Sequence, residues 1–383
     1  MKTGHSEAQL ASQEEVQREN AEPDSTSSVG SADSDVLGFS AQARRTTLWS
    51  ILLVLLLIVV FASGIIIGPT PISLSDVRIA LAHNIFGAEA PASASSANAV
   101  IWDIRVPRLI LGAAVGAGLA VAGAILQAVV RNALADPYIL GINSGASTGA
   151  ALAILFGVGA GFGEYALQGA AFIGALAASA VMFCIARSAG RLTSVRLLMA
   201  GIAVGYALSA VTSFLIFASD SAEGSRSVMF WLLGSLGLGR WGLLLLVSVL
   251  VVVAVTIVFW SMGCRIDALT VGDDAALTMG VNPDRMRVIL VVLTCILVGS
   301  VVAMAGSIGF VGLVIPHAAR RLVGGSHRHM IPVAALLGAS LLIAADIGAR
   351  TLLAPQEIPI GILTSLVGAP FLILLVRRMG VLK

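Results

Sequence analysis

The stretch that decides the fold is Ala303-Met-Ala-Gly-Ser-Ile-Gly-Phe-Val-Gly-Leu-Val-Ile-Pro-His-Ala-Ala-Arg-Arg-Leu-Val-Gly324. It is too apolar for a loop, yet its glycines and Pro316 interrupt it too often for a simple helix that faces lipid. Glycines three residues apart let helix backbones approach closely inside a membrane bundle, and proline bends or ends a helix. Broken helices of this kind are typical of proteins that move solutes across a bilayer. An ordinary kinked helix packed for stability would give the same pattern.

The composition places most of the chain in a lipid bilayer. Hydrophobic residues make up 57% of the sequence, charged residues make up 11%, and the mean hydropathy is +0.97. A soluble domain contains about 25% charged residues. The net charge of +2 neither favours nor excludes a nucleic-acid partner, and no other feature leads us to expect one.

Residues 1–45 differ from everything that follows them. Eight acidic residues lie before Ser40, against Lys2 and Arg18 as the basic ones, and no apolar period emerges. Such a segment cannot bury enough apolar surface to fold alone. We therefore predict two parts, a disordered acidic tail at 1–45 and a transmembrane domain at 46–383.

Apolar segments recur through the second part. Leu48 to Ile67 is an uncharged run of about 20 residues, which is long enough to span a bilayer. Further apolar segments lie at 109–130, 139–158, 165–186, 197–218, 242–262, 288–305, 309–323, 331–347 and 360–376. The sequence therefore predicts an all-α polytopic membrane protein with about ten transmembrane helices.

The basic residues predict the orientation. If the N-terminal tail is inside, most arginines and Lys383 fall in inner loops, and the outer loops hold only Arg78, Arg105, Arg108, Arg226, Arg240 and Arg350. Cytoplasmic loops carry an excess of Lys and Arg. We expect both termini in the cytoplasm and the chain in a cell membrane.

Several motifs together resemble the FecCD family, the permease subunits of ABC importers for iron–siderophore complexes, haem and vitamin B12. They are Gly306-Ser-Ile-Gly-Phe-Val-Gly-Leu-Val-Ile-Pro-His317, Ala345-Asp-Ile-Gly-Ala-Arg350, Glu357-Ile-Pro-Ile-Gly361, Arg105-Val-Pro-Arg108, Arg131-Asn-Ala-Leu-Ala-Asp-Pro137 and Leu140-Gly-Ile-Asn-Ser-Gly-Ala146. The resemblance covers roughly residues 48 to 380 in order. It implies the ABC importer permease fold of the vitamin B12 and iron-chelate type.

The loop between the segments at 242–262 and 288–305 contains a short helix. Asp273 and Asp274 suit its N-terminal dipole, and Gly280 is placed to end it as a left-handed cap, after which Pro283 should prevent a restart. Its apolar residues need a partner, which is either the chain's own surface or, as the resemblance implies, a groove of the ATPase subunit. The residues that the resemblance assigns to this coupling helix are Gly272, Asp273, Asp274, Ala275, Ala276, Leu277, Met279 and Gly280.

The resemblance also implies functions for a turn at the inner face and for three arginines at the outer face. Thr193 and Ser194 could simply cap the following helix, but the family implies a cytoplasmic gate there. On the outer face, Arg105 and Arg108 bracket Pro107 just before the second helix, and Arg350 lies one turn after Asp346, which permits an intrahelical pair. The resemblance implies that these arginines receive acidic residues of a substrate-binding protein, whereas headgroup anchoring is the alternative. Guanidinium suits carboxylate binding because it stays charged and binds in two-point fashion.

The chain contains no P-loop, so we expect no ATPase activity of its own and no cofactor. His317, His327 and His329 lack companion ligands, and we expect no metal site but a hydrated loop around the last two. The predicted function is the permease of a binding-protein-dependent ABC importer that moves an iron–siderophore complex. The expected partners are an ATP-binding subunit, an extracytoplasmic binding protein, and a second copy or a paralogous permease. Haem or cobalamin is the alternative cargo. An ion-coupled secondary transporter, with Asp346 as its coupling residue, and a membrane receptor are the contrasting classes.

Overall fold

The computed structural model describes residues 39–89, 91, 94–188, 190 and 192–380. Contacts divide the chain into two units, Met1–Ala41 and Gln42–Lys383, and the second unit carries everything below. The described residues form helices and turns without a strand, as the sequence predicts. The elements are α2 (Phe39–Ile66), α3 (Leu74–Phe86), α4 (Ser95–Asn98), η2 (Ala99–Arg105), α5 (Val106–Val130), η3 (Pro137–Leu140), α6 (Ile142–Phe156), η4 (Ala160–Tyr165), α7 (Ala166–Ser188), α8 (Ser194–Phe217), α9 (Ala222–Leu232), α10 (Leu243–Ser261), α11 (Gly263–Val271), α12 (Asp273–Thr278), α13 (Pro283–Ala305), α14 (Val311–Val323), α15 (His327–Thr351) and α16 (Ile360–Gly380).

The first membrane helix begins earlier than the sequence predicts. The expected tail reaches residue 45, and its part before Phe39 lies outside the described residues, but α2 is already helical from Phe39. Gln42 and Arg45 explain this, because their side chains donate to the carbonyl oxygens of Val323 and Arg321 at 3.1 and 3.2 Å. These contacts place the start of α2 against the end of α14.

Each of the ten apolar segments lies in a helix, and seven described helices are long and apolar enough to cross a membrane. The predicted boundaries were wrong in two places. The second helix is continuous from Ser95, through a π-helical stretch at η2, so it contains Arg105 and Arg108 instead of following them. Pro283 does not prevent a restart but begins α13, capped by the side chain of Asn282, because proline at a first helical turn loses no hydrogen bond.

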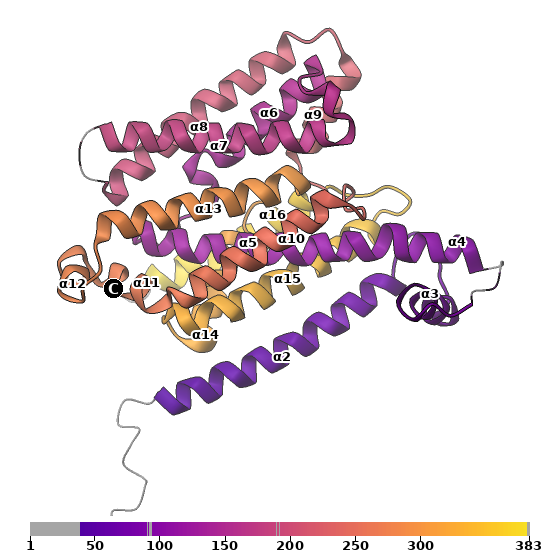
Figure 1. Cartoon of the computed structure of the whole chain (residues 1–383), viewed down its shortest axis with the longest axis horizontal. Coiled ribbons are helices and arrows are strands. Elements are labelled where there is room, and N and C mark those ends of the chain that lie inside the picture. The colour runs from indigo at the N-terminus through magenta and orange to yellow at the C-terminus, as the bar shows by residue number, and fades with distance from the viewer. Residues whose placement is uncertain (1–38, 90, 92–93, 189, 191, 381–383) are drawn as a thin grey trace, which may run out of the picture. The chain divides into compact units, whose positions relative to one another are not determined.

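Helix α5 is the centre of the fold. Of the most apolar stretch of the Ser95–Val130 span 83% is buried, against 17% in the first helix. Figure 1 shows α5 running through the middle, with α10, α13, α14 and α15 around it and α6–α9 in a layer to one side. Glycines make this packing possible, because a Cβ at Gly116 would overlap the carbonyl oxygen of Gly338 in α15, and one at Gly123 would overlap that of Gly312 in α14.

Two of the helices that match predicted membrane segments, α6 and α14, are too short to span a bilayer. The 15 residues of α6 and the 13 residues of α14 reach about 22 and 20 Å, against a hydrocarbon core of about 30 Å. The breaks that precede them meet, because the Tyr138 hydroxyl donates to the carbonyl oxygen of Ile308 at 3.0 Å and accepts from its N–H at 2.8 Å. Phe310 has a positive φ of 68° at the start of α14. The stretch from Ala303 to Gly324 therefore contains a break between two helices of the bundle.

Pro316 lies inside α14 without ending it. A proline cannot donate to the carbonyl four residues earlier, which here belongs to Gly312. The Gln127 amide of α5 donates instead to the carbonyl oxygens of Gly312 and Leu313, at 3.5 and 3.4 Å. A neighbouring helix thus compensates for the missing donor, as membrane bundles require.

Candidate functional site

Helix α5 has polar clusters at both of its ends, and these define two candidate sites. Arg108 lies at its first turn and Arg131 directly follows its last residue. We call the side of the molecule with Arg131 and α12 the α12 end, and the side with Arg108 the cluster end.

At the α12 end, the short helix predicted from the sequence is present as α12 (Asp273–Thr278), and Gly280 follows it with a φ of 76°. Leu277 and Met279 are 50% and 62% exposed, whereas Ala276 is fully buried. Ala276 therefore packs against its own chain. A bulky charge at Ala276 would disturb this packing. The apolar side chains of α12 and its cap that a partner can reach are Leu277 and Met279.

Asp273 fastens α12 to two other elements. The guanidinium of Arg287, in α13, donates to its two carboxylate oxygens at 3.0 and 2.6 Å, and the guanidinium of Arg131 pairs with it as well. These hydrogen bonds, Arg287 first, lower the pKa of the Asp273 carboxyl below its ordinary value, although partial burial opposes them. Asp274 beside it is exposed. Of the two predicted acidic residues, one is an anchor and the other faces solvent.

The predicted gate turn adjoins this anchor. Thr193 caps α8 by accepting from the N–H of Arg196 at 3.4 Å, and the Ser194 hydroxyl donates to the Val129 carbonyl oxygen in α5 at 2.8 Å. The buried Arg287 guanidinium also donates to the carbonyl oxygen of Leu192 at 3.2 Å. One arginine thus joins α12 to the turn that carries Thr193 and Ser194. The capping role is confirmed for Thr193 and not for Ser194, which bonds to α5 instead, and the gate role of both stays a prediction.

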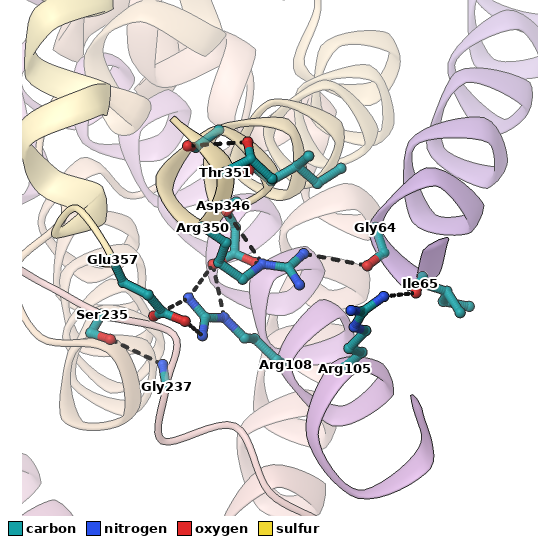
Figure 2. Close-up of polar contacts among 12 residues, drawn as sticks. Gly64, Ile65, Arg105, Arg108, Ser235, Gly237, Asp346, Arg350, Thr351 and Glu357 are labelled. Carbon is teal, nitrogen blue, oxygen red and sulfur yellow. Dashed lines mark hydrogen bonds and ion pairs between the residues drawn. The ribbon is translucent and has the colours of Figure 1, made fainter. Parts of the chain in front are cut away.

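At the cluster end, the Arg108 guanidinium lies between two carboxylates (Figure 2). It is 2.9 Å from Asp346 and 3.0 Å from Glu357, with Arg108 8% and Asp346 1% exposed. Arg350 forms the predicted i,i+4 ion pair with Asp346 at 2.9 Å and donates to the Gly64 carbonyl oxygen at 3.4 Å. Asp346 therefore joins α15 to α5 through Arg108, and Arg350, in the same helix as Asp346, extends the cluster to Gly64 in α2.

Arg105 lies at the same end of the molecule but contacts the end of α2. It is 3% exposed, and its guanidinium donates to the carbonyl oxygens of Ile65, Ile66 and Thr70 at 2.5, 2.9 and 2.6 Å. Figure 2 shows the contact with Ile65. The first two carbonyls belong to the last residues of α2 and the third follows that helix, so all three lie where helical partners run out. All three predicted docking arginines, Arg105, Arg108 and Arg350, are thus buried with partners in their own chain. Of the cluster, Glu357 is the accessible member, with its side chain 44% exposed.

The histidines are not the hydrated loop that we expected. His327 is the first residue of α15, is 3% exposed, and lies 2.5 Å from Asp267 through its Nδ1. His317 lies in α14 with its ring edge-on to Phe371. Across the described part of the chain, no group of three or more His, Cys, Asp or Glu side chains could hold a metal ion.

The comparison with protein families decides what these two sites belong to. The model of the FecCD transport family matches residues 55–378, which is most of the chain. The chain belongs to the FecCD transport family. It is a multi-pass membrane permease of an ABC importer for iron chelates, haem or vitamin B12, so its partners are an ATPase subunit and a substrate-binding protein. ATP hydrolysis belongs to the separate ATPase subunit.

Relatives of known name agree with this membership. A cobalamin import system permease of Halobacterium salinarum is 36% identical over 369 residues, which cover 88% of this chain and 97% of that one. A hemin transport system permease of Yersinia pestis is 41% identical over 290 residues, covering 74% and 86%. A solved metal-chelate type ABC transporter in an inward-facing conformation has a TM-score of 0.75 and 32% identity, covering 86% of this chain and 98% of that one.

Sequence reasoning found the local Asp346–Arg350 pair but missed the partners of charged residues that are distant in sequence. Arg108 and Asp346 are 238 positions apart, and Asp267 and His327 are 60 apart. No periodicity within a segment reports such a pairing. The usable signal in the sequence is the small number of charged residues within apolar segments. A membrane protein must pair the charges that it buries, so these residues are expected to have partners in the chain.

Proposed function

We propose that this FecCD permease moves an iron–siderophore complex into the cytoplasm by ATP-driven alternating access. The observation that carries the coupling part is α12, a short helix with exposed apolar side chains that a charged anchor holds in place. Leu277 and Met279 form a surface that a second subunit can cover, and Asp273 passes force from it to α5 and α13. The likeness to the metal-chelate type transporter supports a ferric chelate as cargo.

Competition between cargoes tests this choice. In a strain that lacks the chain and then regains it, uptake of a labelled ferric siderophore should depend on the chain and should be displaced by excess unlabelled chelate. Haem and cobalamin should not displace it. Displacement by either of them would support the alternative cargo instead, which the hemin and cobalamin relatives favour.

We further propose a homodimer, although a paralogous permease can occupy the same place. Aromatic and aliphatic side chains lie exposed along α8 and α16, among them Tyr206 at 78%, Phe217 at 87% and Leu366 at 72%. Apolar side chains exposed from a membrane bundle contact either lipid or a partner helix, and we assign those on α8 and α16 to the second subunit. A second copy would place the translocation pathway along the two-fold axis, with Thr193 and Ser194 at its cytoplasmic gate.

The proposed orientation puts the α12 end in the cytoplasm, together with residues 1–45 as an acidic tail, because the ATPase subunit works there. The cluster end then faces outward and receives the binding protein, with Arg105, Arg108 and Arg350 as the residues first proposed for docking and Glu357 as the exposed neighbour.

Reporter fusions test this orientation. A reporter that is active only in the cytoplasm should be active when fused after Lys383 and when fused before Leu48. A fusion in the loop between α2 and α3 should be inactive. A periplasmic signal from either terminus would contradict the proposed orientation.

A further inference from the structure

A second carboxylate connects the coupling loop to the membrane bundle. We call α11 and α12, which lie between α10 and α13, the coupling loop. Asp267 belongs to α11, the helix that directly precedes α12. One of its oxygens accepts from the backbone N–H of His327 at 3.0 Å and contacts the Nδ1 of the same residue at 2.5 Å. The other oxygen accepts from the Ser326 hydroxyl at 3.0 Å. Ser326 is the N-cap residue of α15 but makes no side-chain cap of its own. Asp267 thus supplies the cap from another helix, where a negative charge is favoured.

The surroundings of this tie give it a defined geometry. His327 is 3% exposed, and its Nε2 is buried without a hydrogen-bond partner among the described residues. A hydrogen on Nδ1 directed at Asp267 leaves Nε2 bare, which avoids a buried donor without an acceptor. Partial burial would raise the pKa of Asp267, but the hydrogen bonds from His327 and Ser326 outweigh it and lower that pKa. The Trp260 indole adds a second link to α15 by donating to the Arg328 carbonyl oxygen at 2.9 Å.

Helix α15 reaches from this tie to the other end of the molecule. Its 25 residues extend about 37 Å, and Asp346 and Arg350 lie in its last two turns. Along the way Gly338 lies against Gly116 of α5 with backbone in contact. Close contact of two backbones resists sliding and bending, because packed cores respond as units. The pair α5–α15 is joined to the coupling loop at one end, by Asp273 and by Asp267, and is cross-linked at the other end by Asp346.

We propose that Asp267 and His327 form the second attachment of the coupling loop, through which a displacement of α11 and α12 is passed to the α5–α15 pair and so to the cluster around Asp346. The inference rests on the proposed role of α12 as the contact with the ATPase. Asp267 and His327 are positioning residues, since they act on transport through α15. They complete a connection between the two ends that Asp273 alone makes only to α5 and α13.

Matched substitutions at His327 test the attachment in the assembled importer. The His327→Asn amide nitrogen can occupy the place of Nδ1 and keep the bond to Asp267, whereas His327→Leu removes it. In proteoliposomes with the ATPase and binding protein, His327→Leu should transport roughly tenfold fewer cargo molecules per ATP hydrolysed, a size typical of coupling between sites. His327→Asn should stay within about twofold. His329→Leu is the control, because this half-exposed neighbour in the same turn has no hydrogen bond to Asp267.

The remaining outcomes also decide. A normal ratio of transport to hydrolysis in assembled His327→Leu would overturn the proposal and leave Asp267 as a cap only. If that variant does not assemble, His327→Gln replaces it, since its amide nitrogen reaches the place of Nε2 instead. Equal coupling in the Asn and Gln variants would then overturn the proposal. Leu277→Glu separates this result from the role of α12, because normal co-purification of the ATPase with Leu277→Glu would contradict that role alone.

Discussion

Replacing Asp273 with Ala should detach α12 from the membrane bundle and disconnect the permease from its ATPase. The change leaves Arg287, which is 2% exposed, without its carboxylate partner. Breaking a fully buried ion pair costs about 3–5 kcal/mol. Because the Asp273 side chain is 38% exposed, we expect a smaller loss of about 2 kcal/mol in the free energy of unfolding, reduced by solvent screening. The transport rate should fall by more than the loss of folded protein explains, since both Arg131 and Arg287 lose their link to α12.

Asp274→Ala is the matched control, as it removes the same charge from the same helix turn at an exposed position. Thermal unfolding and co-purification of the ATPase should change in Asp273→Ala and not in Asp274→Ala. The pKa of Asp273 is lowered in the folded chain, so its stabilising contribution is complete above the unfolded value of about 3.9 and is lost as the pH falls through the folded pKa. The difference between the two variants should therefore be full at neutral pH. Identical behaviour of the two would show that Asp273 is not an anchor.

Replacing Arg350 with Glu should strongly destabilise the cluster end. The side chain of Arg350 is 4% exposed and lies 2.9 Å from Asp346. The substitution removes one of the two cations that neutralise Asp346 and adds a like charge beside it. The expected loss is about 3–5 kcal/mol or more, the range for breaking a buried pair. The variant should reach the membrane in low yield and should unfold at a lower temperature.

Arg240→Glu is the control for Arg350→Glu, because it reverses a charge at an exposed position before α10. It should leave yield and unfolding unchanged. The docking role predicts a different result for Arg350→Glu, namely a stable permease whose ATPase partner is stimulated less by the loaded binding protein, most clearly at low salt. A stable variant with that defect would favour docking over the internal role of Arg350.

The sequence predicted the helices better than it predicted the residues at their ends. Apolar runs between Leu48 and Leu374 identified the membrane segments, because length and hydropathy are properties of each segment alone. The motif from Gly306 to His317 predicted the interruption before α14. The start of the second membrane span at Ser95, in α4, was missed, because the Ala- and Ser-rich stretch there lacks apolar periodicity.

The side-chain partners at the sites could not be predicted for a physical reason. Whether Arg108 faces a binding protein or Asp346 depends on how α5 and α15 pack, and that packing depends on Gly116 meeting Gly338. Likewise, the sequence alone predicts Ala276 to be a surface residue of a loop. Its burial follows only from the packing of α12 against the rest of the chain. Local patterns specify elements, whereas burial and pairing follow from contacts between elements that are distant in sequence.

The most direct test of the account is the energy source of uptake. The permease is reconstituted in proteoliposomes with its ATPase and binding protein, and accumulation of a labelled ferric siderophore is measured. Uptake should require ATP on the side of α12 and loaded binding protein on the other side, and it should continue when ionophores remove all ion gradients. Uptake by the permease alone that follows a proton gradient and is lost in Asp346→Asn would contradict the account and indicate a secondary transporter.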